Sequence, residues 1–172
     1  MPYTPMSDLG QQGLFDITRT LLQQPDLGAL SDALTRLVRQ SALADSAAIV
    51  LWHSGSHRAS YFSTRENGKA FEYEDETYLA HGPIRRILSR PEALHCNFEE
   101  FRQAWPMLAR SALYQPFGHY SLLPLAVEGH IFGGCEFIRN TDQPWSEAEY
   151  ERLHTFTQIV AVVAEQIQSR VS

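Results

Sequence analysis

The strongest constraint on the fold is the stretch from His119 to Asn140, which reads HYSLLPLAVEGHIFGGCEFIRN. Two long apolar runs, Tyr120 to Val127 and Ile131 to Ile138, are separated by the pair Glu128-Gly129. A glycine can supply the positive φ that a tight turn needs, so the pattern predicts a β-hairpin. Neither run alternates strictly between apolar and polar residues. We therefore expect both faces of the hairpin to be covered and the hairpin to form the middle of a sheet.

The length of 172 residues, with 44% hydrophobic residues, suits a single globular domain with a sizeable core. No run of about 18 apolar residues occurs, and the N-terminus has no basic start followed by an apolar segment. We expect neither a membrane span nor a signal peptide, and a cytoplasmic location. The two cysteines, Cys96 and Cys135, have no CxxC spacing, which favours buried thiols in a reducing compartment.

The formal net charge of -6 argues against binding to a nucleic-acid backbone, because that requires a clustered basic surface. A phosphate-binding loop is also excluded. The single lysine, Lys69, follows Gly68 but precedes Ala70, whereas the loop needs serine or threonine there. We expect this chain to contact neither DNA nor ATP directly.

Helical spacing of apolar residues predicts helices before and after the hairpin. We interpret residues 1–10 as a flexible lead-in and residues 11–172 as one domain. A first helix begins near Leu14 and ends before Pro25, and a second is capped by Asp26. The last helix starts at Glu147 behind a capping box of Ser146 and Glu149, with Trp145 and Tyr150 placed as a hydrophobic staple. Because no stop signal follows, we expect this helix to continue into a longer protein.

Between these helices the chain predicts short strands and small helices. The strands are expected at Ala47 to Trp52, Arg58 to Ser63, Ala70 to Tyr73 and Glu92 to Cys96. Pro83 is suited to the first position of a helix that runs to Ser89, and Asn97 with Glu100 resembles a capping box for a helix over Phe98 to Ala104. Met107 to Gly118 is expected to be loop or broken helix.

The fold class that follows is α+β. An antiparallel sheet carries the terminal helices on one face and the small helices and loops on the other. This arrangement predicts a pocket between the sheet and the small helices.

Several long phrases resemble a known family: MPYTPMSDLGQQGLFDITRTLLQQPDL, SALADSAAIVLW, YEDET, LAHGP, FGHY and EGHIFGGCEFIR. They resemble the N-terminal GAF domain of sigma-54-dependent transcriptional activators of formate hydrogenlyase genes, over essentially the whole chain. The resemblance implies a GAF-like (PAS/profilin-like) sensory fold, formate as the signal, and no enzymatic activity. It also implies that a central AAA+ ATPase and a C-terminal helix-turn-helix, absent here, contact ATP, sigma-54 RNA polymerase and DNA.

The candidate ligand site centres on Arg85 and Arg86, in the first turn of the helix opened by Gly82-Pro83. Cations are disfavoured at a helix N-terminus, so a negative group is expected nearby. One answer is the acidic segment Glu72 to Glu76. The other is a small carboxylate such as formate, held by an arginine fork. The further candidate residues are His81, Gly82, Arg58, Arg65, His119 and Tyr120.

Metal binding is not expected, because His95-Cys96 and the pair His130 and Cys135 lack the spacing of metal ligands. We expect no cofactor. Glu136, on an otherwise apolar strand, must find a donor, and we expect an arginine. The pair Gly133-Gly134 predicts a bulge or a close approach by another group.

The interpretation that follows is a sensory domain that binds formate or a similar small anion, forms a homodimer through its first and last helices, and regulates an attached ATPase. Two alternatives remain open. One is a ligand-free dimerisation module that uses the terminal helices, which a pocket filled by side chains would favour. The other is a GAF-fold methionine sulfoxide reductase acting through cysteines.

Overall fold

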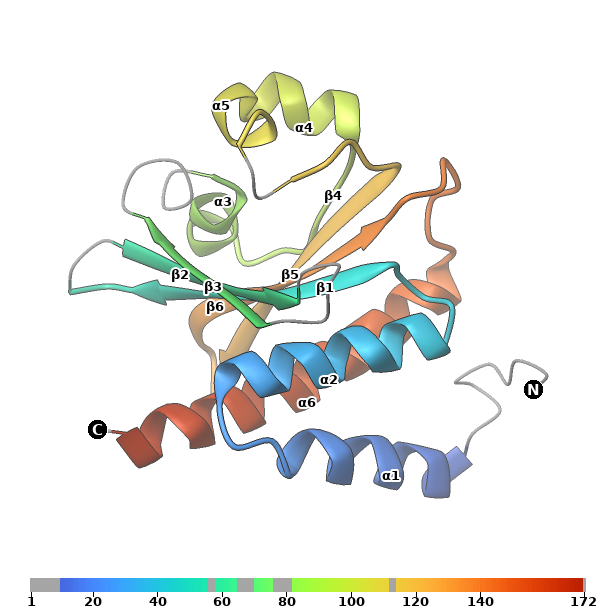
Figure 1. The fold of residues 1–172 in the computed structure, drawn as a ribbon, viewed down its shortest axis with the longest axis vertical. Coiled ribbons are helices and arrows are strands. Elements are labelled where there is room, and N and C mark those ends of the chain that lie inside the picture. Colours follow the sequence, from blue (N-terminus) through green and yellow to red (C-terminus); the bar gives the residue numbers. More distant parts are fainter. Residues whose placement is uncertain (1–9, 56–57, 65–69, 76–81, 112–113, 172) are drawn as a thin grey trace.

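The fold is a six-stranded antiparallel sheet that lies between two layers of helices (Figure 1). The computed structural model describes residues 10–55, 58–64, 70–75, 82–111 and 114–171, with the side chains at 10–12, 64, 70–75 and 171 left aside. The strands are β1 (Ser46–His53), β2 (Arg58–Thr64), β3 (Ala70–Asp75), β4 (Leu94–Asn97), β5 (His119–Val127) and β6 (His130–Arg139). Their order in the sheet is β3-β2-β1-β6-β5-β4.

The predicted hairpin is confirmed as β5 and β6, and it occupies the interior of the sheet. β6 pairs with β1 on its other side, and β5 pairs with β4. At the turn, Glu128 has φ 52° and Gly129 has φ 79°. Both turn residues are therefore left-handed, as in the two-residue turns whose twist matches that of paired strands. The sequence argument assigned this conformation to the glycine alone.

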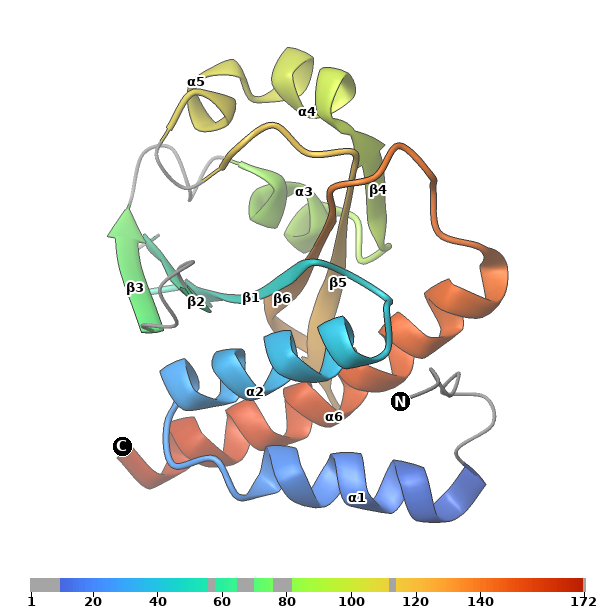
Figure 2. The ribbon, with the colours of Figure 1, turned by 45° about the vertical axis from the view of Figure 1, so that its right-hand side comes forward.

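The terminal helices cover one face of the sheet, as predicted. α2 (Leu27–Gln40) and α6 (Glu147–Val171) pack on the strands, and α1 (Gly10–Leu22) packs against both of these helices. Figure 2 shows α1 on the side of α2 and α6 that faces away from the sheet. The core between them is mainly aliphatic, with a few aromatic rings, and includes Leu34, Ile49 and Phe156, each with 0% of its surface exposed.

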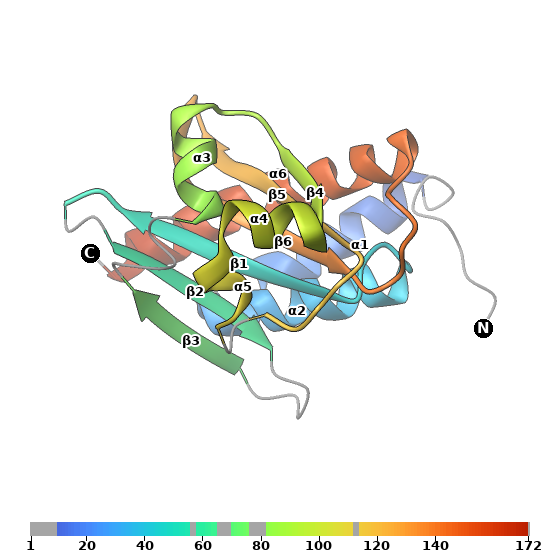
Figure 3. The same ribbon diagram turned by 90° about the horizontal axis from the view of Figure 1, so that it is seen from above.

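The small helices cover the other face. α3 (Pro83–Ser89), α4 (Phe98–Ala104) and α5 (Pro106–Ala109) lie above the sheet in Figure 1 and in front of it in Figure 3, which is seen from above. Their core is aromatic and includes Phe101, Phe117 and Tyr120. α5 occupies the start of the segment expected as loop or broken helix, and proline stands at its first position.

Local signals in the sequence place the starts of α2, α4 and α6 correctly, whereas α1 begins at Gly10, before the predicted start near Leu14. The Asp26 carboxylate accepts the backbone N–H of Ala29 at 2.8 Å, and Asn97 and Glu100 form the predicted capping box. The Ser146–Glu149 capping box is also present, with N–H to side-chain distances of 2.9 and 3.2 Å. These bonds satisfy amide groups that a helix start would otherwise leave unpaired.

Both predictions for Gly133-Gly134, a bulge and a close approach by another group, are confirmed. Leu125 pairs with Gly133 and Ala126 with Ile131, so β6 carries one extra residue and forms a bulge. A Cβ at Gly134 would lie 2.9 Å from Cδ1 of Ile87, so this glycine lets α3 approach the sheet closely. α3, which Gly134 allows to pack closely on the sheet, carries the candidate residues Arg85 and Arg86.

Candidate functional site

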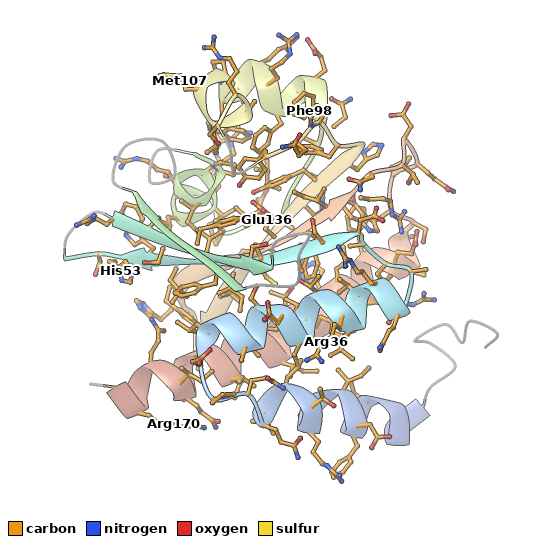
Figure 4. All side chains as sticks on the ribbon, viewed as in Figure 1. Arg36, His53, Phe98, Met107, Glu136 and Arg170 are labelled. Carbon is orange, nitrogen blue, oxygen red and sulfur yellow. The ribbon has the colours of Figure 1, made fainter. Side chains whose placement is uncertain are left out.

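A buried carboxyl lies at the centre of the small-helix side. Glu136 projects from β6 towards α3–α5 and is 1% exposed (Figure 4). The Tyr61 hydroxyl donates to its Oε1 at 2.8 Å, and the Tyr114 hydroxyl donates to its Oε2 at 2.6 Å. A third tyrosine, Tyr120, adds a hydrogen bond. We call these four residues the Glu136 cluster.

The electrostatics of the Glu136 cluster follow from burial. Burial raises the pKa of Glu136 above its usual value, and the hydrogen bonds from Tyr114, Tyr61 and Tyr120 counteract part of that rise. Burial also raises the pKa of all three tyrosines well above the usual value, and the Glu136 charge adds to the effect. The tyrosines therefore remain protonated and act as hydrogen-bond donors.

The prediction that an arginine donates to Glu136 is wrong, because the donors are tyrosines. Strand β2, strand β5 and the segment before β5 each bring a tyrosine over the sheet at this point. Their phenol rings join the aromatic core, and only their hydroxyl groups need a polar partner. A donor can thus reach Glu136 without a second charge being buried.

Aromatic rings fill the described part of the layer around the Glu136 cluster. Phe101 lies 5.0 Å from both Tyr114 and Tyr120 and 5.3 Å from Phe117, measured between ring centroids. Phe98 adds a further edge contact to Phe117 at 4.9 Å. Within the residues described, these aromatic side chains pack against one another and occupy this part of the layer between the sheet and the small helices.

A second candidate site lies on the outer side of α3. Here Arg85, Arg86, Arg90 and Trp105 line an open groove of about 440 Å³, which we call the arginine groove. The remaining lining residues are Gly82, Ser89 and Ala104. The guanidinium carbon of Arg86 lies 5.3 Å from the centroid of the Trp105 ring, a cation–π contact.

The arginine groove carries positive charge that the described residues do not neutralise. Arg85, Arg86 and Arg90 are all exposed, and none of the three guanidiniums forms an ion pair within the part of the chain that the structure describes. By contrast, Arg102 on the neighbouring helix is paired with Glu99. The arrangement can bind an anion through planar N–H forks.

The structure separates the predicted site residues into different places. Gly82, Arg85 and Arg86 share the arginine groove, and Tyr120 belongs to the Glu136 cluster. His119 lies in neither, because its Nε2 is 2.9 Å from the Asp142 carbonyl beyond the end of β6. Arg58, at the start of β2, is not among the lining residues of the groove.

Two candidates, His81 and Arg65, fall outside the described residues, as do the side chains of the acidic segment Glu72 to Glu76.

Sequence reasoning missed Arg90 and Trp105. Arg90 directly follows the last residue of α3, and its backbone N–H donates to the Arg86 carbonyl at 2.9 Å, so the predicted end of this helix was a usable signal for its place near Arg86. No local pattern links Trp105 to these arginines. It comes from the junction of α4 and α5, which tertiary packing brings over α3.

The thiols are poorly suited to nucleophilic chemistry. Burial raises the pKa of Cys96 to about 12, with the Glu100 charge adding to the rise. Burial also raises the pKa of Cys135, which lies in the aliphatic core. A cysteine reacts as the thiolate, so neither group is activated.

Metal binding and membrane insertion find no support in the described residues. No three histidine, cysteine, aspartate or glutamate side chains there gather closely enough to hold a metal ion. Nor is any helix in those ranges both long and apolar enough to cross a membrane.

Comparison with known proteins gives close relatives of the whole chain. The GAF domain family model matches residues 26–166. The chain is 76% identical over 172 residues to "Formate hydrogenlyase transcriptional activator" of Salmonella typhimurium, covering 100% of this chain and 25% of that protein. It is 69% identical over 171 residues to "Formate hydrogenlyase transcriptional activator FhlA" of Escherichia coli, covering 99% of this chain and 25% of that protein. The chain thus spans about a quarter of the length of these relatives.

Solved structures share the fold at low identity. The GAF domain of an Acinetobacter phosphoenolpyruvate-protein phosphotransferase superposes with TM-score 0.69 at 16% identity, covering 95% of this chain and 97% of that one. A free methionine-R-sulfoxide reductase from Neisseria meningitidis superposes with TM-score 0.66 at 11% identity, covering 99% and 96%. The close relatives are named as transcriptional activators rather than enzymes, and the reductase shares only the fold. The prediction that the chain is not an enzyme is therefore confirmed.

Proposed function

This chain belongs to the GAF domain family, and we propose that it is the ligand-sensing regulatory domain of a sigma-54-dependent activator of formate hydrogenlyase genes. The support is the 69% and 76% identity to relatives that carry the name of such an activator. The chain corresponds to 25% of their length, so ATP hydrolysis, contact with sigma-54 RNA polymerase and DNA binding are assigned to the remainder. A cytoplasmic location accompanies this role.

The ligand of the domain is formate or a similar small anion, bound in the arginine groove. The observation behind this assignment is the group of exposed guanidiniums of Arg85, Arg86 and Arg90, none of which has an ion-pair partner among the described residues. Arginine suits a carboxylate because its fork donates two parallel hydrogen bonds. The Glu136 cluster is the less suitable place, since an anion there would face a buried carboxyl group.

The size of formate limits its affinity. The best very small ligands gain about 1.5 kcal/mol per heavy atom, so formate cannot gain more than roughly 4.5 kcal/mol. That value corresponds to a dissociation constant near or above the millimolar range. The domain would therefore respond to the accumulation of formate rather than to traces of it.

Titration of the domain with formate, acetate and nitrate tests the proposal. Arg85→Lys and Arg86→Lys keep the charge but lose the fork, so at least one of them should weaken formate binding without lowering the melting temperature. Arg36→Lys is the matched control, because Arg36 is exposed on α2 in the other helical layer (Figure 4). Formate binding that is unchanged in both groove variants would move the site elsewhere. A lack of binding up to tens of millimolar would remove formate as the ligand of this domain.

The second candidate function is a ligand-free dimerisation module. Two observations favour it: aromatic rings occupy the described part of the layer under the small helices, and α1 exposes large apolar side chains. Leu14, Phe15 and Leu22 on α1 are 41%, 58% and 41% exposed, and Val162 on α6 is 48% exposed. Exposed apolar surface of this kind favours contact with a partner. A homodimer through these terminal helices also fits the sensory role, in which α6 would transmit the signal.

Sedimentation equilibrium tests the dimer. Phe15→Glu should convert a dimer into a monomer, whereas Met107→Glu, on the small-helix side, should leave it unchanged. A wild-type monomer at high protein concentration would contradict this contact. Dimers without any anion binding would favour the ligand-free module over the sensor.

A further inference from the structure

We propose that the arginine groove selects compact anions that carry two or more negative charges, namely phosphate esters or di- and tricarboxylates, over monocarboxylates. The inference rests on the proposed function in one respect, that the groove is the anion site. It specifies the ligand class differently, because it makes formate a weak member of the set.

Charge balance is the first reason. The groove contributes three guanidiniums from Arg85, Arg86 and Arg90, and the described residues that line it include no carboxylate. Arginine stays protonated at any physiological pH, so the three charges are permanent. A monocarboxylate neutralises one of them and leaves the other two to repel each other. An anion with two or three charges interacts favourably with all three at once.

Preorganisation is the second reason. α3 is anchored to the sheet by Ile84 and Ile87, which are 2% and 0% exposed. The Arg90 backbone N–H donates to the Arg86 carbonyl at 2.9 Å, which keeps the two residues one helical turn apart. The cation–π contact with Trp105, 5.3 Å from the guanidinium carbon to the ring centroid, restricts the position of the Arg86 side chain.

The opposite wall of the groove is equally fixed. Trp105 ends α4, and its backbone N–H donates to the Phe101 carbonyl at 2.8 Å. Phe101 is 0% exposed within the aromatic core. Both walls are therefore built on the same buried layer, so binding requires little rearrangement of the backbone that carries them.

Size is the third reason. A volume of about 440 Å³ lies within the range of sites for metabolite-sized ligands. Formate would leave most of it to water. A phosphorylated or multicarboxylate metabolite fills more of the groove that Arg85, Arg86 and Arg90 line. A long polyanion is disfavoured by the net charge of -6 on the whole chain.

Titrations of the chain at constant low ionic strength, followed by amide chemical shifts or calorimetry, test the proposal. The probes are formate, succinate, citrate, inorganic phosphate and pyrophosphate, so that the carboxylate and phosphate arms are compared directly. We expect the best multivalent probe to bind at least tenfold more tightly than formate and to displace it. Arg90→Gln should reduce multivalent binding at least fivefold and formate binding less. Arg36→Gln, which removes an exposed charge from the other layer, is the matched control.

The outcomes separate this inference from the proposed function. Formate binding without preference for multivalent anions overturns the inference and leaves the sensor proposal standing. Multivalent binding without formate binding supports the inference and removes formate as the signal. Binding of neither class overturns both. Equal loss of multivalent affinity in Arg90→Gln and Arg36→Gln would mean that only net charge matters, and it would also overturn the inference.

Discussion

Replacement of Tyr114 by phenylalanine tests the energetic role of the Glu136 cluster. The Tyr114 hydroxyl donates to Glu136 Oε2 at 2.6 Å in a buried setting, while its ring packs 5.0 Å from that of Phe101. The Tyr114→Phe change keeps the ring and removes only the donor. A hydrogen bond to a charged group contributes about 1.5–3 kcal/mol, so we expect a loss of this size in the free energy of unfolding. For a domain of 172 residues this lowers the melting temperature by roughly 3 to 12 °C.

The loss should depend on pH in a defined direction. The pKa of Glu136 is raised in the folded state, chiefly by burial. Its proton-linked stabilisation is therefore complete below the pKa of an unfolded glutamate and is lost as the pH rises through the folded pKa. The Tyr114 hydrogen bond lowers that pKa, so removing it raises the pKa further. Tyr114→Phe should thus cost more at pH 8 than at pH 5.

Urea unfolding at both pH values, followed by tryptophan fluorescence, measures the effect. Tyr150→Phe is the matched control, because this half-buried tyrosine lies on α6, outside the Glu136 cluster. In a Glu136→Gln background, Tyr114→Phe should cost only about 0.5–1.5 kcal/mol, the value for a neutral hydrogen bond, and the pH dependence should vanish. A cost below about 0.5 kcal/mol, or one equal at the two pH values, would refute this account of the Glu136 cluster.

Three further predictions concern packing, reactivity and charge. Gly134→Ala should destabilise the domain by about 1–3 kcal/mol in urea unfolding, because the added Cβ would lie 2.7 Å from a leucine side chain, whereas Gly55→Ala, with nothing within 4 Å, should be nearly neutral. Both cysteines should resist iodoacetamide at pH 7.5 and react once urea unfolds the chain, since burial raises their pKa; rapid native labelling would contradict this. Partial burial by itself would raise the pKa of Glu149. Hydrogen bonds from Arg139 and Ser146 outweigh this effect and lower that pKa. Glu149→Gln should therefore cost about 1 kcal/mol at neutral pH, and this cost should disappear as the pH falls through the folded pKa; an equal cost at acidic pH would exclude the ion pair as its origin.

The sequence predicted those parts of the fold that depend on near neighbours along the chain. Asp26, Asn97 and Ser146 each cap a helix through a backbone N–H only three residues away. Both partners of each bond therefore lie within one short segment of the sequence. The same holds for the Glu128-Gly129 turn, which joins two strands that pair directly. These interactions form wherever the local backbone is helical or turned, with little help from the rest of the protein.

The candidate site depended on tertiary structure. Trp105 meets Arg86 only because α4 and α3 pack on the same aromatic core. Glu136 receives hydroxyls from Tyr61 and Tyr114, which are 75 and 22 residues away along the chain. No periodicity or capping rule relates residues at such separations. Sequence alone thus determined the elements, their order and the need of a buried Glu136 for a donor. The packing of the helical layers on the sheet decided which side chains came into contact. Partners on different elements are brought together only by the tertiary structure.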